Sequence, residues 1–156
     1  MTYESLVIES EKHNIVIIEK NFKSNAKGLC KGNKIGISLR LVTDKERVCV
    51  LSEELGHYFT SSGNILDQTK TVNRKQELRA RRWGYEKLVP LNSLIEAFEN
   101  GITTEYDLCE FLNITENFLK EAIEHYRMKY GLYCQQGKYL IYFEPTLIIC
   151  KSFKNN

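Results

Sequence analysis

The stretch Leu51-Ser52-Glu53-Glu54-Leu55-Gly56-His57 lies in the middle of residues 45–60, whose spacing of apolar residues predicts one amphipathic α-helix. Asp44 stands directly before this segment and is a favourable residue for capping a helix. Side chains three and four positions apart lie together on a helix surface. The two glutamates and the histidine of this stretch are therefore expected to share one face, while the apolar residues face the core.

The chain before this helix has the pattern of strands. Residues 13–19 contain a run of β-branched residues, and residues 34–42 alternate polar and apolar side chains. Residues 28–33, between them, contain glycines and an asparagine that favour turns. We therefore predict a small N-terminal antiparallel sheet in this part of the chain.

The chain after this helix favours further helices and then returns to short strands. Periodicity and capping residues predict helices over about residues 74–88, 91–99, 104–112 and 115–130. Short strands are predicted at about 138–143 and 146–150. This order of elements indicates an α+β fold. We expect a first part at residues 1–100, a helical appendage at 101–131 and a C-terminal β segment at 132–156, together forming one compact unit.

The composition is typical of a soluble globular domain. Of its 156 residues, 42% are apolar and 27% are charged, and a chain of this length can bury a core. The net charge of +2 gives no general attraction to nucleic acid or membranes. Because the apolar runs are too short to span a bilayer and the first residues lack the pattern of a secretory signal, we expect a cytosolic protein without a membrane partner.

The segment from Glu53 to His57 differs by one letter from H-E-x-x-H, a pattern that places two histidines one helical turn apart to bind zinc. A glutamate occupies the first position here. The residues alone leave three interpretations: a metal centre with a carboxylate ligand, an inactive remnant of such a centre, or a solvated charged face of a helix. The spacing permits Glu53 and His57 to hold one metal ion while Glu54 lies beside it.

A second segment adds to this motif. It reads Glu77-Leu78-Arg79-Ala80-Arg81-Arg82-Trp83-Gly84-Tyr85-Glu86-Lys87-Leu88-Val89-Pro90. Together with residues 51–57, it resembles the ImmA/IrrE family of zinc-dependent peptidases, which pair a helix carrying H-E-x-x-H with a helix of the form E-x-x-A-x-x-F/W-A/G-x-x-L-L/V-x-P. The chain matches the second pattern at Glu77, Ala80, Trp83, Gly84, Leu88 and Pro90. The resemblance implies a helical zincin-like core on which the N-terminal sheet packs.

The resemblance also implies roles for four residues. Glu53, His57 and Glu77 would be metal ligands, and Glu54 would be the general base in metal-dependent hydrolysis of a peptide bond. Zinc is the implied ion, but two carboxylates are harder ligands than imidazoles, so Mn²⁺ or Fe²⁺ also suits the site. We expect weaker metal binding than in relatives with histidine at position 53, and tighter binding after Glu53→His.

The partner implied by the resemblance is a protein substrate, a helix-turn-helix repressor of a phage or mobile element, inactivated by limited cleavage. The alternative is an anti-repressor that binds such a partner without hydrolysing it. Residues 108–123 themselves have the pattern of a helix-turn-helix. The acidic residues Glu116, Glu121 and Glu124 on its second helix argue against direct DNA binding, since they would face phosphates.

A basic cluster on the second motif helix has two interpretations. Arg74, Arg79 and Arg82 either form a solvated helix face or provide a docking surface for an acidic partner, because guanidinium groups suit carboxylates.

Overall fold

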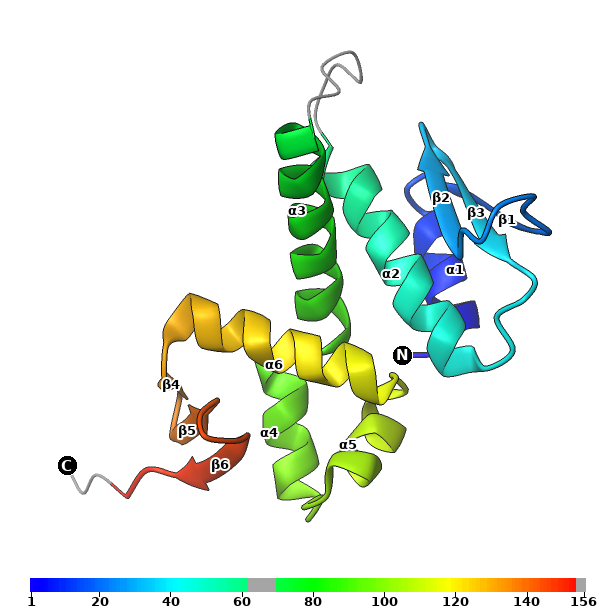
Figure 1. The fold of residues 1–156 in the computed structure, drawn as a ribbon. Coiled ribbons are helices and arrows are strands. Elements are labelled where there is room, and N and C mark those ends of the chain that lie inside the picture. The colour runs from blue at the N-terminus through cyan, green and yellow to red at the C-terminus, as the bar shows by residue number, and fades with distance from the viewer. Residues whose placement is uncertain (62–69, 154–156) are drawn as a thin grey trace.

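The computed structural model describes residues 1–61 and 70–153, with the backbone alone described for residues 70–72. These residues form an α+β fold (Figure 1), which confirms the predicted class. The N-terminal part contains α1 (Tyr3–Glu11), β1 (Val16–Lys20), β2 (Gly28–Lys31), β3 (Lys34–Ser38) and α2 (Asp44–Thr60). The remainder contains α3 (Lys70–Leu88), α4 (Leu91–Glu99), α5 (Glu105–Leu112), α6 (Glu116–Tyr130), β4 (Tyr133–Gln136), β5 (Tyr139–Tyr142) and β6 (Ile148–Lys151).

The N-terminal sheet has the strand order β1-β3-β2 and is mixed, whereas the sequence predicted an antiparallel sheet. β2 and β3 are antiparallel, and the two residues between them form a tight turn in which Gly32 adopts a φ of 59°. β1 pairs with β3 in parallel, with Val16 opposite Lys34. The prediction was wrong here because side-chain alternation identifies a strand without specifying the direction of its partner. The arrangement leaves β2 at an edge of the sheet, in contact with α2.

The helix α1 was not predicted. Thr2 caps it with a reciprocal pair of hydrogen bonds to Ser5, and Leu6 and Ser10, one turn apart, are buried. This helix is only weakly amphipathic, unlike the equally short α4, so its periodicity does not stand out in the sequence.

The start of α2 differs from the prediction by one residue. Thr43 is the N-cap, and it exchanges hydrogen bonds with Glu46 in a capping box. Asp44 is instead the first helical residue, and its carboxylate accepts hydrogen bonds from the Tyr3 backbone at 3.2 Å and from the Asn113 side chain at 2.6 Å. The residue predicted as the cap therefore links α2 to two other parts of the fold.

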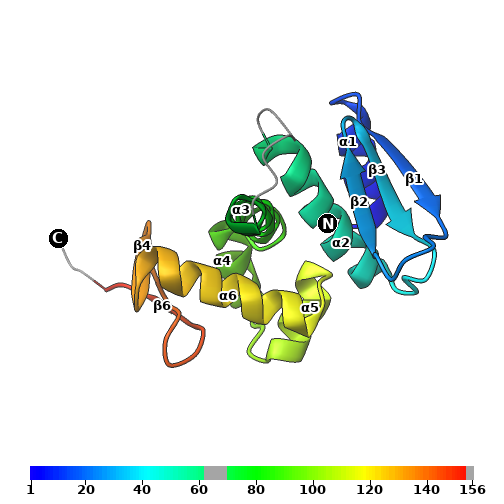
Figure 2. The same cartoon turned by 45° about the horizontal axis from the view of Figure 1, so that its top comes forward.

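Small residues bring α2 and α3 close together. In Figures 1 and 2, α2 lies between the N-terminal sheet and α3. A Cβ atom placed on Gly56 would lie 2.1 Å from the backbone oxygen of Ala80, and one placed on Gly84 would lie 3.0 Å from Ser52 Oγ. The two helix backbones can approach this closely only because these positions carry little or no side chain. Gly56, Ala80 and Gly84, all of which belong to the two sequence motifs, thus set the spacing of the helices.

The elements after α3 follow the predicted order. α4 has the predicted bounds, and Thr115 caps α6 by accepting a hydrogen bond from the Phe118 backbone. β4, β5 and β6 form an antiparallel sheet at the end of α6, on the opposite side of the helices from the N-terminal sheet (Figure 1). One buried apolar cluster extends from Val48 in α2 to Ala122 in α6. Among the described residues, none of the helices combines the length and apolar content needed to cross a lipid bilayer.

Candidate metal centre

The three predicted ligands Glu53, His57 and Glu77 come together at one side of the contact between α2 and α3. One donor atom from each residue lies within 4.8 Å of the other two. The His57 Nε2 and Glu77 Oε1 atoms are 3.4 Å apart. This convergence depends on the close approach of Gly56 and Ala80: Gly56 directly precedes His57, and Ala80 lies about one turn after Glu77.

The donor set fits a divalent metal ion. Zinc binds histidine nitrogen and carboxylate oxygen at about 2.0–2.2 Å, so two of its ligands in a tetrahedral site lie about 3.3 Å apart. The separation of 3.4 Å between the His57 and Glu77 atoms matches this value. Three protein ligands also leave a fourth position open, as in catalytic rather than structural zinc sites.

Glu54 lies against the edge strand β2. A Cβ atom on Gly28 would lie 2.7 Å from Glu54 Oε1, so the lack of a side chain at Gly28 gives this carboxyl group its space. Burial, together with the nearby carboxylates of Glu53 and Glu77, raises the pKa of Glu54 to about 7, although a hydrogen bond from the Cys30 backbone opposes the shift. A carboxyl group that titrates near neutral pH suits a residue that accepts and returns a proton.

Glu53 makes a contact that the sequence interpretation did not assign. Arg81, on α3, donates a hydrogen bond from Nε to Glu53 Oε1 at 3.3 Å. Arg81 follows Glu77 by four residues, and this spacing was the signal that both side chains leave the same face of their helix. Nearby, the Tyr85 hydroxyl donates to Glu121 at 2.7 Å. Burial and this hydrogen bond raise the pKa of Tyr85, so its hydroxyl stays protonated.

The three arginines of the predicted basic cluster are not equivalent. Arg79 and Arg82 line a hollow of about 530 Å³ between α3 and the end of α6. The other residues that line it are Thr60, Trp83, Glu86, His125, Met128 and Lys129. Arg74 is exposed nearer the start of α3 and does not line this hollow.

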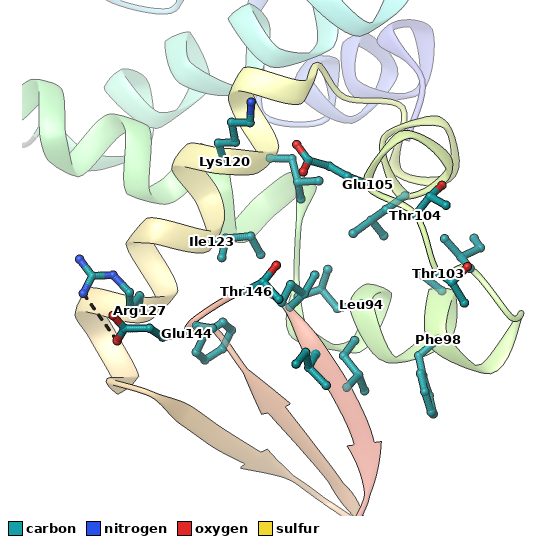
Figure 3. A pocket seen from close by; sticks show the side chains of 18 of the residues that line it. Leu94, Phe98, Thr103, Thr104, Glu105, Lys120, Ile123, Arg127, Glu144 and Thr146 are labelled. Carbon is teal, nitrogen blue, oxygen red and sulfur yellow. Dashed lines mark ion pairs between the residues drawn. The ribbon is translucent and has the colours of Figure 1, made fainter.

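A further hollow, of about 780 Å³, lies between α4, α5, α6 and the segment that joins β5 to β6 (Figure 3). Leu94 and Ile123 belong to its largely apolar wall, and Arg127 and Glu144 form an ion pair of 4.0 Å within its lining. None of the three candidate ligands lines it. This hollow is therefore separate from the candidate metal centre.

Comparison with known families accounts for both motifs. The profile of the IrrE N-terminal-like domain, a peptidase family, matches residues 10–124. No curated protein and no solved structure matched the chain. The matched range is most of the chain and includes both α2 and α3, with Glu53, Glu54, His57 and Glu77. The chain therefore belongs to the ImmA/IrrE family of metallopeptidases.

Proposed function

We propose that this protein is a metal-dependent endopeptidase that makes limited, site-specific cuts in a protein substrate. The observation that carries the proposal is the convergence of donor atoms from Glu53, His57 and Glu77 beside the partly buried Glu54. Membership of a peptidase family supports the same chemistry. Zinc is the ion we propose, and the two carboxylates also suit Mn²⁺ or Fe²⁺.

The residues of the site divide the chemistry between them. When bound, a divalent ion polarises the scissile carbonyl and favours attack by water. Glu54 takes a proton from the attacking water and delivers it to the leaving amine. Glu53, His57 and Glu77 would hold the ion from two helices, and the close packing of Gly56 against Ala80 keeps these helices at a fixed separation.

We further propose that the substrate is a helix-turn-helix repressor of a phage or mobile element, cleaved in the cytosol. Arg79 and Arg82 would dock an acidic segment of this partner. Both arginines are exposed, and within residues 1–61 and 73–153 neither takes part in an ion pair. The adjacent Trp83 offers an apolar surface in the same hollow, which favours a protein segment over a nucleic-acid backbone.

Cleavage and metal content test the proposal together. The protein is purified without chelators, its metal content is measured, and it is then incubated with the candidate repressor. We expect bound metal and one discrete cut, and we expect Glu54→Gln to retain the metal while losing the cut. Unchanged cleavage by this variant would exclude Glu54 as the base. A protein that binds the repressor but neither holds metal nor cuts would be an anti-repressor instead.

A further inference from the structure

Two contacts join α2 to α3 beside each other at the candidate metal centre. One is the pair of His57 and Glu77, with 3.4 Å between Nε2 and Oε1, and the other is the pair of Glu53 and Arg81, with 3.3 Å between Oε1 and Nε. Glu53 precedes His57 by four residues, and Glu77 precedes Arg81 by four. The Glu53 side chain is 35% exposed and the Arg81 side chain 50% exposed. Arg81 therefore contacts the residue that stands at the position of the missing histidine.

This contact changes the charge of the site. A histidine that binds a metal is neutral, whereas an ionised glutamate carries one negative charge. The guanidinium of Arg81 carries one positive charge at all ordinary pH values. Glu53 and Arg81 together thus carry no net charge, as a neutral histidine would. Without Arg81, the site would contain an uncompensated third carboxylate next to Glu54 and Glu77.

We propose that Glu53 and Arg81 act as one unit in place of the histidine expected at position 53. Arg81 is a positioning residue in this unit: its hydrogen bond orients the Glu53 carboxylate and its charge offsets the added negative charge. This inference rests on the proposed metal centre. It revises the expectation from the sequence that Glu53→His alone tightens metal binding.

The two effects of Arg81 on metal affinity oppose each other. Removing a hydrogen-bonding partner of a ligand weakens metal binding by about 10–100-fold. Removing a positive charge a few ångströms from a divalent ion, at a partly exposed site, strengthens binding by about tenfold. With Glu53 present, Arg81→Gln has both effects, and their net result lies between no change and about tenfold weaker binding. With histidine at position 53, the Glu53 carboxylate is no longer there to pair with Arg81, and only the repulsion between the Arg81 charge and the metal ion remains.

A double-mutant cycle with Zn²⁺ as the probe tests the unit. Zinc dissociation constants are measured by competition with a chromophoric chelator for the wild type, Glu53→His, Arg81→Gln and the double variant. We expect Glu53→His alone not to tighten zinc binding, because the positive charge of Arg81 is then unpaired beside the ion. Arg81→Gln should tighten binding about tenfold in the variant with histidine, but in the wild type it should leave binding unchanged or weaken it by up to about tenfold. Arg79→Gln, on the same helix and away from Glu53, should leave both affinities unchanged.

The results separate this inference from the proposed function. Equal tightening by Arg81→Gln in both backgrounds would show that Arg81 acts as an independent charge and would overturn the unit. Greater tightening in the wild type would show that Arg81 competes with the metal for Glu53, and would overturn it as well. Absence of zinc binding by all four proteins would overturn the metal centre itself, together with this inference.

Discussion

Replacing Glu54 by glutamine should stabilise the metal-free protein at neutral and alkaline pH. The pKa of Glu54 is raised from 4.5 to about 7, chiefly by burial, so the folded state disfavours the ionised carboxylate. The unfolded chain loses its proton near pH 4.5, and the wild type therefore loses stability as pH rises from about 4.5 to about 7. Above that range the penalty is constant. Glutamine has nearly the same shape and cannot ionise, so the variant avoids this loss.

The pKa shift sets the size of the effect. One pKa unit corresponds to about 1.4 kcal/mol, so the full shift corresponds to about 3 kcal/mol in the free energy of unfolding. We expect the variant and the wild type to have similar stability below about pH 4.5. The variant should be more stable by about 2–3 kcal/mol above pH 7.

Urea unfolding over a pH series, in the presence of a chelator and followed by the fluorescence of the single tryptophan, measures this difference. Glu105→Gln is the control: it makes the same change at an exposed glutamate of α5 that does not perturb Glu54, so it should give no comparable gain. The reasoning would be refuted if the stability difference between Glu54→Gln and the wild type did not depend on pH. It would also be refuted if the wild type were more stable than the variant above pH 7.

Three further variants test other parts of the site. Gly28→Ala places a Cβ atom 2.7 Å from Glu54 Oε1, so cleavage of the substrate should fall at least tenfold while calorimetry shows unchanged metal affinity. Unchanged cleavage would mean that Glu54 needs no fixed position. Gly56→Ala places a Cβ atom 2.1 Å from a backbone oxygen of α3. This variant should lower the free energy of unfolding, measured in urea, by about 3 kcal/mol and should weaken zinc binding. Stability equal to that of the wild type would contradict the close helix contact. Charge reversal at Arg79 and Arg82 should weaken repressor binding at least tenfold in a pull-down or titration without changing zinc affinity, and equal repressor binding would remove the docking surface.

The sequence predicted the helices well because their signals are local. Pro90 marks the end of one helix and Thr115 the start of another by chemistry that acts within about one turn; α3 ends at Leu88, and α6 begins directly after Thr115. The parallel pairing of β1 with β3 was missed because it depends on contacts between distant segments. α1 was missed because its apolar residues do not gather on one face, so it lacks the amphipathic pattern of the equally short α4.

The same distinction, between local signals and contacts of distant segments, applies to the candidate metal site. His57 and Glu77 belong to two motifs whose spacing on their own helices is local, and the resemblance to a family related the two helices to each other. The contact of Arg81 with Glu53 could be predicted only in part. The spacing of four residues after Glu77 places Arg81 on the same helix face as Glu77, but the partner of Arg81 depends on how α2 and α3 pack. No local signal indicated that Gly28 leaves space for Glu54, because the two residues come from a strand and a helix that meet only in the fold.

The central claim is that Glu53, His57 and Glu77 bind one divalent metal ion. Anomalous diffraction at the zinc absorption edge, from crystals grown with zinc, tests it most directly. The account predicts one strong peak about 2.0–2.2 Å from a carboxylate oxygen of Glu53, from His57 Nε2 and from a carboxylate oxygen of Glu77. Zinc-containing crystals without a peak at this position, or with a peak bound to other residues, would contradict it.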